Sequence, residues 1–377
     1  QSHSDSTLSI NETHINQNEN SVLLLNAESV GNKIDELTNL IFSLNPRPNI
    51  IGIAETWLNS NYSDSELTMN SNYCVFRQDR SSRGGGVCLL VSPSLKPRLS
   101  SITSDGCELV WVDCQIGSYY LKICCYYRPP YRNKNTLPSL SNSIALALRS
   151  KGPDGSEPKI LVMGDFNVNT LDKSHYLYDE LSDLVSVHNL HQFVNQPTYH
   201  KPNTVPSLLD HIYSNDPELI SQVDYLSPLG ACYHSILFCR FMPSIRQTKP
   251  TVVRRTIWQY SKADWARAND MLFSYHLVEG VDINHAWDHF HSFFMNVMEQ
   301  CVPKKSVKCK AKDPPWLNSE LRKMCRKKHM LFRKWKKSMN DDIYSKYKCI
   351  RNKLSNRLKH AKRVFFESLL DDVSPSK

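Results

Sequence analysis

The chain contains no Cys-x-x-Cys pair, although twelve of its 377 residues are cysteine. This absence argues against zinc ribbons and knuckles, and we interpret the cysteines, several of which stand inside apolar runs, as buried reduced thiols. No apolar run approaches the roughly 18 residues of a membrane span. The N-terminal residues lack the basic-then-apolar pattern of a signal peptide, and there is no initiator Met. We therefore expect a nuclear or cytoplasmic protein that is not secreted, and the missing Met leaves open that the chain is a fragment of a longer one.

Composition and charge divide the chain into parts. Apolar residues make up 40% and aromatic residues 10%, which is enough for a large core. Residues 303–377 hold 23 Lys or Arg against 7 Asp or Glu, a net charge of +16, whereas the rest of the chain carries −7. We expect a disordered lead-in over 1–20, a large folded domain over 21–242, an aromatic-containing linker or small helical unit over 243–302, and a basic helical hairpin over 303–377.

Short apolar runs and amphipathic stretches follow one another along residues 21–242. The runs predict strands at 22–25, 50–54, 73–77, 86–91, 108–114, 119–127, 160–163, 208–213 and 235–239. Helical spacing of apolar residues predicts helices over 32–45, over 137–150 and near 175–188. This order indicates an α/β protein, a four-layer α/β sandwich of two packed mixed β-sheets flanked by helices, with a C-terminal basic helical extension over 317–338 and 341–370.

Polar residues recur where the predicted strands begin or end. Gly164-Asp165-Phe166-Asn167 follows the run 160–163 and places a carboxylate and an amide on one face, two residues apart. The other members are Asn26, Glu55, Tyr127, Asp210 and His234. Any one of them alone is more often structural, as in a strand end followed by an Asx turn. Together they can assemble phosphodiester hydrolysis, with a carboxylate that binds Mg²⁺ or Mn²⁺, an Asp that activates water and a His that bonds the phosphate.

The strings around these residues resemble the endonuclease/exonuclease/phosphatase superfamily over 22–241, and more closely the endonuclease of non-LTR (LINE-type) retrotransposons. The tail resembles the segment that joins endonuclease to reverse transcriptase in jockey-like elements. The matching strings lie at 25–29, 33–37, 54–58, 83–87, 127–130, 164–167, 196–198 and 207–212, and in the tail at 315–317, 347–353 and 365–367.

The resemblance implies a Mg²⁺- or Mn²⁺-dependent endonuclease that hydrolyses a phosphodiester bond to nick target DNA. It implies that Glu55 and Asn26 hold the metal, and that Asp165 with Asn167 positions or deprotonates the attacking water. His234 would contact the scissile phosphate. The remaining roles are transition-state support by Tyr127, electrostatics from Asp210, and nucleic-acid contacts from Arg128, Thr198, Arg322, Lys323, Arg326, Lys327 and Lys328. The expected partners are target DNA, element RNA at the basic tail, and a reverse transcriptase domain outside this chain, with no membrane.

The resemblance breaks at one position. The family ends in Ser-Asp-His, where the Asp holds the His tautomer and stabilises its cationic form, but this chain has Cys232-Tyr233-His234. Tyr233 cannot supply that charge. We therefore expect a lowered His234 pKa, a loosely held ring and attenuated nicking.

Four alternatives stay open, two for the whole chain and two for its basic tail. The chain could be a catalytically weak nucleic-acid-binding relic of the same fold, or a superfamily phosphatase acting on a small phosphoester. The basic tail could be a solvated helical pair, or a hairpin that docks onto a missing polymerase domain.

Overall fold

The computed structural model describes residues 20–69, 72–103, 106–116, 119–130, 136–241, 253–276, 280, 282–309 and 314–371. The chain forms two compact units. The main unit comprises Gln1–Pro250 with Lys312–Lys377, and the small unit comprises Thr251–Ala311. The lead-in expected over 1–20 lies outside the described residues, except for Asn20.

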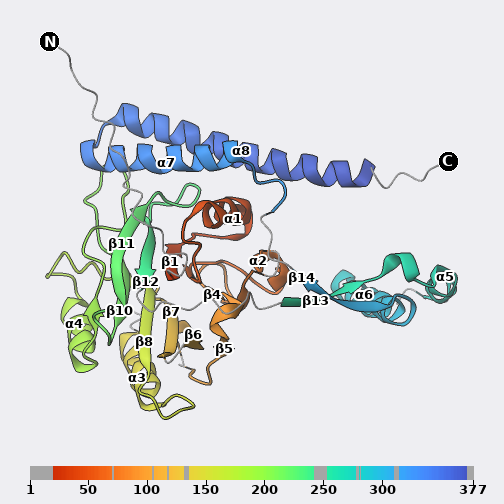
Figure 1. Ribbon diagram of the computed structural model, residues 1–377, viewed down its shortest axis with the longest axis horizontal. Coiled ribbons are helices and arrows are strands. Elements are labelled where there is room, and N and C mark those ends of the chain that lie inside the picture. The colour runs from red at the N-terminus through yellow and green to blue at the C-terminus, as the bar shows by residue number, and fades with distance from the viewer. Residues whose placement is uncertain are drawn as a thin grey trace. The chain divides into compact units, whose positions relative to one another are not determined.

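Two six-stranded mixed sheets form the main unit (Figure 1). The first has the order β11-β12-β1-β2-β4-β3 and consists of β1 (Asn20–Asn26), β2 (Ile50–Ala54), β3 (Cys74–Gln78), β4 (Val87–Val91), β11 (Ile220–Leu226) and β12 (Ile236–Phe241). The second has the order β5-β6-β7-β8-β10-β9 and consists of β5 (Arg98–Leu99), β6 (Glu108–Ile116), β7 (Tyr119–Tyr127), β8 (Lys159–Asp165), β9 (His191–Gln192) and β10 (Asp210–Ser214). The pairs β1–β2 and β7–β8 are parallel, and the other neighbours are antiparallel.

The sheets pack face to face and carry helices on their outer faces. Alternate residues such as Leu24 and Met163 meet in the core between the sheets. Helix α1 (Ile34–Ser43) packs on the outer face of the first sheet, and α3 (Leu137–Arg149) and α4 (Tyr178–Val187) cover the second. Short elements η1 (Gly31–Lys33), α2 (Asp64–Leu67) and η2 (Pro93–Leu95) complete this part. The predicted four-layer α/β sandwich is confirmed, although β5, β9 and β11 were not anticipated from the sequence.

The basic tail forms the hairpin α7 (Ser319–Ser338) and α8 (Asp341–Asp371), close to the predicted helices. The Asn318 side chain accepts a hydrogen bond from the Leu321 amide and caps α7, which ends at Met339 in the left-handed region, with φ 52°. Asn340 then accepts from the Asp342 and Ile343 amides and begins α8. A two-residue turn with local capping therefore fixes the hairpin.

The hairpin packs on α1 of its own chain (Figure 1). Leu321 of α7 and Leu358 of α8 are buried in the same apolar cluster as Leu37 of α1. The interleaved aromatic residues Phe332, Trp335 and Tyr347 form a core within the hairpin. Because its apolar face is covered by α1, the hairpin is a further part of the main unit's outer layer.

The small unit combines two strands and two helices. Its elements are β13 (Val253–Trp258), η3 (Tyr260–Lys262), α5 (Trp265–Phe273), α6 (Ile283–Cys301) and β14 (Lys304–Cys309), with β13 and β14 antiparallel. The strand β14 lies inside the range 303–377 that the charge pattern assigned to the hairpin, because its lysines continue the basic run. No described helix is both long and apolar enough to cross a membrane. The described cysteines are free thiols and most are buried, as expected.

Candidate active site

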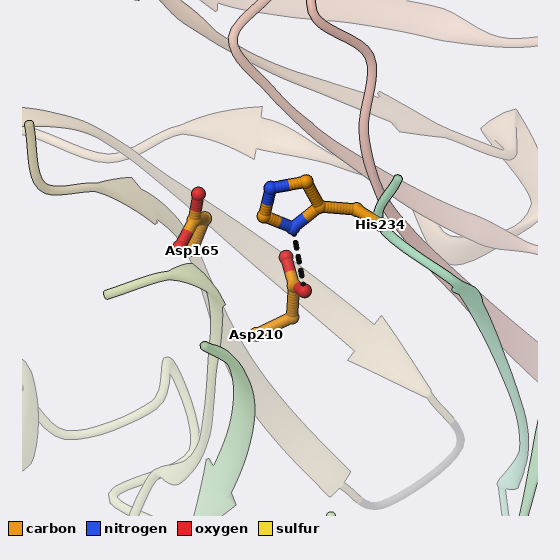
Figure 2. Close-up of side chains that lie close together, drawn as sticks. All are labelled: Asp165, Asp210 and His234. Atoms are coloured by element: carbon orange, nitrogen blue, oxygen red, sulfur yellow. Dashed lines mark hydrogen bonds and ion pairs between the residues drawn. The ribbon is translucent and has the colours of Figure 1, made fainter. Parts of the chain in front are cut away.

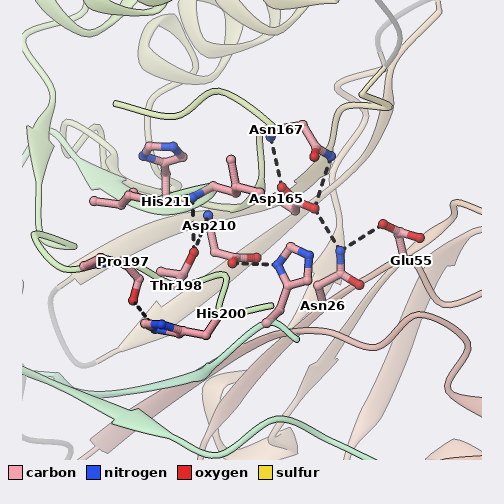
Figure 3. Close-up of polar contacts among 12 residues, drawn as sticks. Asn26, Glu55, Asp165, Asn167, Pro197, Thr198, His200, Asp210 and His211 are labelled. Carbon is pink, nitrogen blue, oxygen red and sulfur yellow. Dashed lines mark hydrogen bonds and ion pairs between the residues drawn. The ribbon is translucent and has the colours of Figure 1, made fainter. Parts of the chain in front are cut away.

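One edge of the two sheets gathers the polar strand-end residues. Because β1 and β2 are parallel, Asn26 pairs with Ala54, which places Glu55 beside it. In the second sheet Asp165 lies between its strand partners Tyr127 and Asp210. The sandwich brings these two sets together, although they are far apart in the sequence (Figure 3).

Asn26 links the two sheets through its side-chain amide. It donates to Glu55 Oε1 at 3.0 Å and to Asp165 Oδ2 at 2.8 Å. The other Glu55 oxygen accepts from Trp57 Nε1 at 3.2 Å. Tyr127 is buried beside Glu55 and Asp165, and burial together with these carboxylates raises the pKa of its phenol. The side chains that the sequence assigned to the metal are therefore held in one hydrogen-bonded group.

Asp165 is fully buried and held from several sides. Its Oδ1 accepts from the Asn167 backbone amide at 2.9 Å, and its Oδ2 accepts from Asn167 Nδ2 at 3.2 Å. Asn167 has a φ of 48°, an unusual conformation that aims its side chain back at Asp165. The preceding Gly164 lies so close to β7 that a Cβ there would stand 1.7 Å from the Tyr126 carbonyl oxygen, so only glycine fits.

His234 forms an ion pair with Asp210. Its Nδ1 lies 2.9 Å from Asp210 Oδ2, and both side chains are buried. Figure 2 shows Asp165, Asp210 and His234 converging from three segments, and potential ligand atoms of the three lie within 4.8 Å of one another. Although burial opposes the charged ring, the Asp210 carboxylate raises the pKa of His234 to about 10. Burial and Asp210 raise the pKa of Asp165 to about 7.

This ion pair corrects the expectation for Tyr233. The sequence predicted a lowered His234 pKa and a loose ring, because the neighbouring position lacks a carboxylate, and both predictions are wrong. Asp210, 24 positions earlier, already bonds the ring nitrogen. Tyr233 is half-buried, and its ring packs edge-on against Tyr199. The basis for expecting attenuated nicking therefore disappears.

Three residues expected to touch nucleic acid are buried. Arg128 donates to the carbonyl oxygens of Phe166 and Asn167, so it supports the loop that carries the active-site amide. Thr198 Oγ1 accepts from the backbone amides of Leu209 and Asp210 and fixes the start of β10. Lys328 is paired with Glu36 beneath the hairpin. Because these polar groups are occupied inside the protein, Arg128 and Thr198 support the backbone of the site, and Lys328 fastens α7 to α1.

The other tail residues expected to contact nucleic acid lie on the outer face of α7. Lys323, Arg326 and Lys327 are exposed, and Arg322 is half-buried. Exposed positive charge of this kind is compatible with nucleic-acid binding, but it does not identify a ligand.

Sequence reasoning missed several neighbours of the site. Glu28 follows Asn26 by two residues, and burial raises its pKa, with His234 and Glu55 among the nearby charges. Arg80 bonds Glu108 and lies over the Tyr127 ring, with its guanidinium carbon 5.7 Å from the ring centroid. Glu28 and Trp57 lay within the matching strings and could have been singled out. Arg80 lies in a loop between strands, and nothing in its sequence context marks it.

The donor set fits a hard divalent cation. Carboxylate oxygens from Glu28, Glu55, Asp165 and Asp210 outnumber the nearby cations, and oxygen is the donor that Mg²⁺ and Mn²⁺ prefer. Among the described residues Asp210 Oδ1 is a buried acceptor without a hydrogen-bond partner. The raised Asp165 pKa shows that the site disfavours full ionisation, which a bound cation would offset.

Comparisons with known proteins agree with this architecture. A family model described as the Endonuclease/Exonuclease/phosphatase family matches residues 16–231, more than half of the chain. The chain therefore belongs to the endonuclease/exonuclease/phosphatase family, whose members hydrolyse phosphoesters. A second model, described as the Female sterile protein K10 C-terminal domain, matches residues 317–373, which include the hairpin. A search of curated proteins found no match.

Several solved structures are similar in fold. The endonuclease domain of TRAS1, a telomere-specific non-LTR retrotransposon, is 16% identical with a TM-score of 0.46, over 60% of this chain and 99% of that one. The AP endonuclease LMAP from Leishmania major is 13% identical with a TM-score of 0.49, over 59% and 88%. The 3' phosphatase NExo from Neisseria, bound to product DNA hairpin, is 10% identical with a TM-score of 0.45, over 59% and 98%. The family membership rests on the family model.

Proposed function

We propose that this chain is a Mg²⁺- or Mn²⁺-dependent DNA endonuclease that hydrolyses one phosphodiester bond and so nicks target DNA. The observation that supports it best is the buried group of Asp165, Asp210 and His234, whose ligand atoms lie within 4.8 Å of one another. This group holds one carboxylate with a pKa near neutrality beside a histidine that stays cationic. A base and a cation side by side match attack by water on an anionic phosphodiester.

Asp165 is the proposed base. A carboxylate with a pKa of about 7 can accept a proton from water at neutral pH and does so better than an ordinary Asp. Asn167, bonded to Asp165 through both its backbone and its side chain, keeps the carboxylate orientation fixed. The proposed base is therefore oriented before the substrate binds.

His234 is the proposed phosphate ligand. Asp210 bonds Nδ1, which leaves the second ring nitrogen as a charged donor for a phosphate oxygen. Because the site is buried, this charge is screened little, and it stabilises negative charge that develops in the transition state.

Glu55 and Asn26 are the proposed residues that hold the cation. Tyr127, buried beside Glu55, is proposed to support the transition state. A bound divalent cation would withdraw charge from the phosphate and its leaving oxygen. The hydrogen bond from Asn26 to Asp165 joins the metal-binding residues to the proposed base.

The retrotransposon origin is the finer part of the proposal. The strings of residues 25–29, 54–58 and 164–167 and the tail strings support a non-LTR, LINE-type and jockey-like element. On this proposal the native partners are target DNA, element RNA and a reverse transcriptase domain outside this chain, and the protein works in the nucleus or the cytoplasm.

Nicking of supercoiled plasmid tests the activity. We expect conversion to open circles with Mg²⁺ or Mn²⁺ and none in EDTA. Glu55→Gln should lower the rate by about 10²-fold or more, and titration calorimetry should show weaker Mn²⁺ binding. Glu66→Gln, an exposed acid on α2, is the matched control and should keep both.

The result contradicts the proposal if the wild-type protein binds DNA without cleaving it in any divalent cation. That outcome would favour a nucleic-acid-binding relic. Release of phosphate from small phosphoesters without nicking would favour a phosphatase.

A further inference from the structure

A cavity of about 510 Å³ opens between the hairpin and the core of the main unit. Its walls come from Gln196, Pro197 and His200 in the segment before β10, from Val223–Tyr225 on β11, and from Arg333, Lys336 and Lys337 near the end of α7. We call it the hairpin pocket. The hairpin is anchored next to it, since the His329 ring bonds Ser227 Oγ at 2.7 Å just after β11.

Basic side chains dominate the charge of the hairpin pocket. Arg333, Lys336 and Lys337 line it, against the single carboxylate of Asp224. No ion pair of these three cations occurs within the described part of the chain, whereas Lys328 and Lys362 of the same hairpin pair with acids of α1. Three cations therefore surround the cavity with no ion pair to them among the described residues.

Lys336 is held in place despite this repulsion. Its ammonium lies 5.4 Å from the centroid of the Tyr225 ring and 5.6 Å from that of Phe332. Burial and the neighbouring Arg333 lower the pKa of Lys336 to about 8. The Tyr225 hydroxyl accepts from the Asn195 and Gln196 amides, which fixes the ring beneath the ammonium. A bound anion would offset the cost of keeping these charges close together.

The segment Gln196–His200 connects this pocket with the active site. Thr198 fixes Asp210, and Tyr199 pairs with His234 as an isolated bridge, with ring centroids 4.9 Å apart. His200, the next residue, lines the pocket. Figure 3 shows Pro197 and His200 at the opposite end of the polar row from Glu55. Tyr199 contacts His234, and its neighbour His200 lines the pocket, with at most about 3.6 Å of chain per residue. A strand bound at His234 should therefore reach the pocket within a few nucleotides.

We propose that the hairpin pocket is a subsite for a backbone phosphate of the DNA, flanking the scissile phosphate on the His234 side, with Arg333, Lys336 and Lys337 as its ligands. The inference deepens the proposed endonuclease function and rests on it. It assigns the hairpin's DNA contact to the end of α7 that faces the catalytic core. The outward residues Lys323, Arg326 and Lys327 are then only solvated charges.

Two matched triple variants test the proposal. The pocket variant is R333A/K336A/K337A, and the control is K323A/R326A/K327A, which removes the same one Arg and two Lys from exposed positions of the same helix. The full chain is titrated in EDTA with a fluorescein-labelled DNA duplex by fluorescence anisotropy, at several salt concentrations. We expect the pocket variant to lose about tenfold or more in affinity and to flatten the log K against log salt slope by about one to two units. The control should lose about threefold or less.

A variant expected to gain affinity provides a test that misfolding cannot mimic. Asp224→Asn removes the one carboxylate among the described residues that line the pocket and should tighten DNA binding severalfold. The same substitution in the pocket variant should have a smaller effect. Equal losses in the two triple variants, or an Asp224→Asn protein that binds no better than wild type, would overturn the subsite.

The plasmid assay separates this inference from the proposed function. A wild-type protein that binds DNA through the pocket but cuts none leaves the subsite standing and removes the endonuclease. A protein that nicks while both triple variants bind equally well leaves the endonuclease and removes the subsite. Absence of DNA binding by the wild-type protein overturns both.

Discussion

Lys328→Met should destabilise the main unit strongly. Lys328 and Glu36 expose only 2% and 6% of their side chains, and the ammonium also donates to the Pro228 carbonyl oxygen at 2.8 Å. Burial alone would lower the Lys328 pKa, but the Glu36 carboxylate more than offsets this and raises it. Removing the ammonium leaves Glu36 buried, with the Gly230 amide at 3.1 Å as its remaining partner among the described residues.

Breaking a buried ion pair by removing one partner costs about 3–5 kcal/mol. At about 2–4 °C of Tm per kcal/mol for a domain of this size, the expected shift is roughly 6–20 °C downward. The double variant Lys328→Met/Glu36→Gln should recover part of the loss, because the neutral amide no longer leaves an unpaired charge. The double-mutant cycle should therefore give a coupling energy above about 1 kcal/mol.

Urea unfolding and thermal scans of the four proteins measure these quantities. Lys327→Met is the matched control, because this lysine is the next residue of α7 and is exposed, so its loss should cost less than about 0.5 kcal/mol. A Lys328→Met protein as stable as Lys327→Met, or strictly additive single effects, would refute the conclusion that the hairpin is an integral layer of the main unit.

Two further predictions concern His234. Tyr233→Asp should change the nicking rate by less than about threefold, since Asp210 already holds the ring, whereas Asp210→Asn should lower it by about 10²-fold or more; a large gain from Tyr233→Asp would restore the case for attenuation. The folded-state pKa of His234 is raised from 6.5 to about 10, so its ion pair stabilises the fold fully below pH 6.5 and progressively less as pH rises towards 10. The Tm advantage of wild type over His234→Gln in EDTA should therefore shrink over this window, and an advantage independent of pH would contradict the assigned pKa.

The sequence alone determined much of the sheet architecture and the position of the candidate site. Runs such as 22–25 and 160–163 are buried strands because both sheet faces are covered, which leaves continuous apolar residues. A polar residue at the end of such an apolar run marks the edge of the sheet. Asn26, Glu55 and Asp165 could therefore be identified individually from the sequence. Short strands such as β9, with two residues, carry too little periodicity to be found.

Only the tertiary structure determined which side chains pair with one another. Reasoning from neighbours in sequence assigned the histidine's carboxylate to position 233 and found a tyrosine there, but β10 brings Asp210 to His234 from 24 positions away. In the same way a run of five basic residues over 322–328 looked uniform in the sequence. The 3.6-residue period of α7 turns Lys328 inward to Glu36 and leaves Lys323, Arg326 and Lys327 outside. Charge is local to the sequence, whereas burial and pairing depend on what the fold places opposite each side chain, and that is why the partner residues could not be predicted.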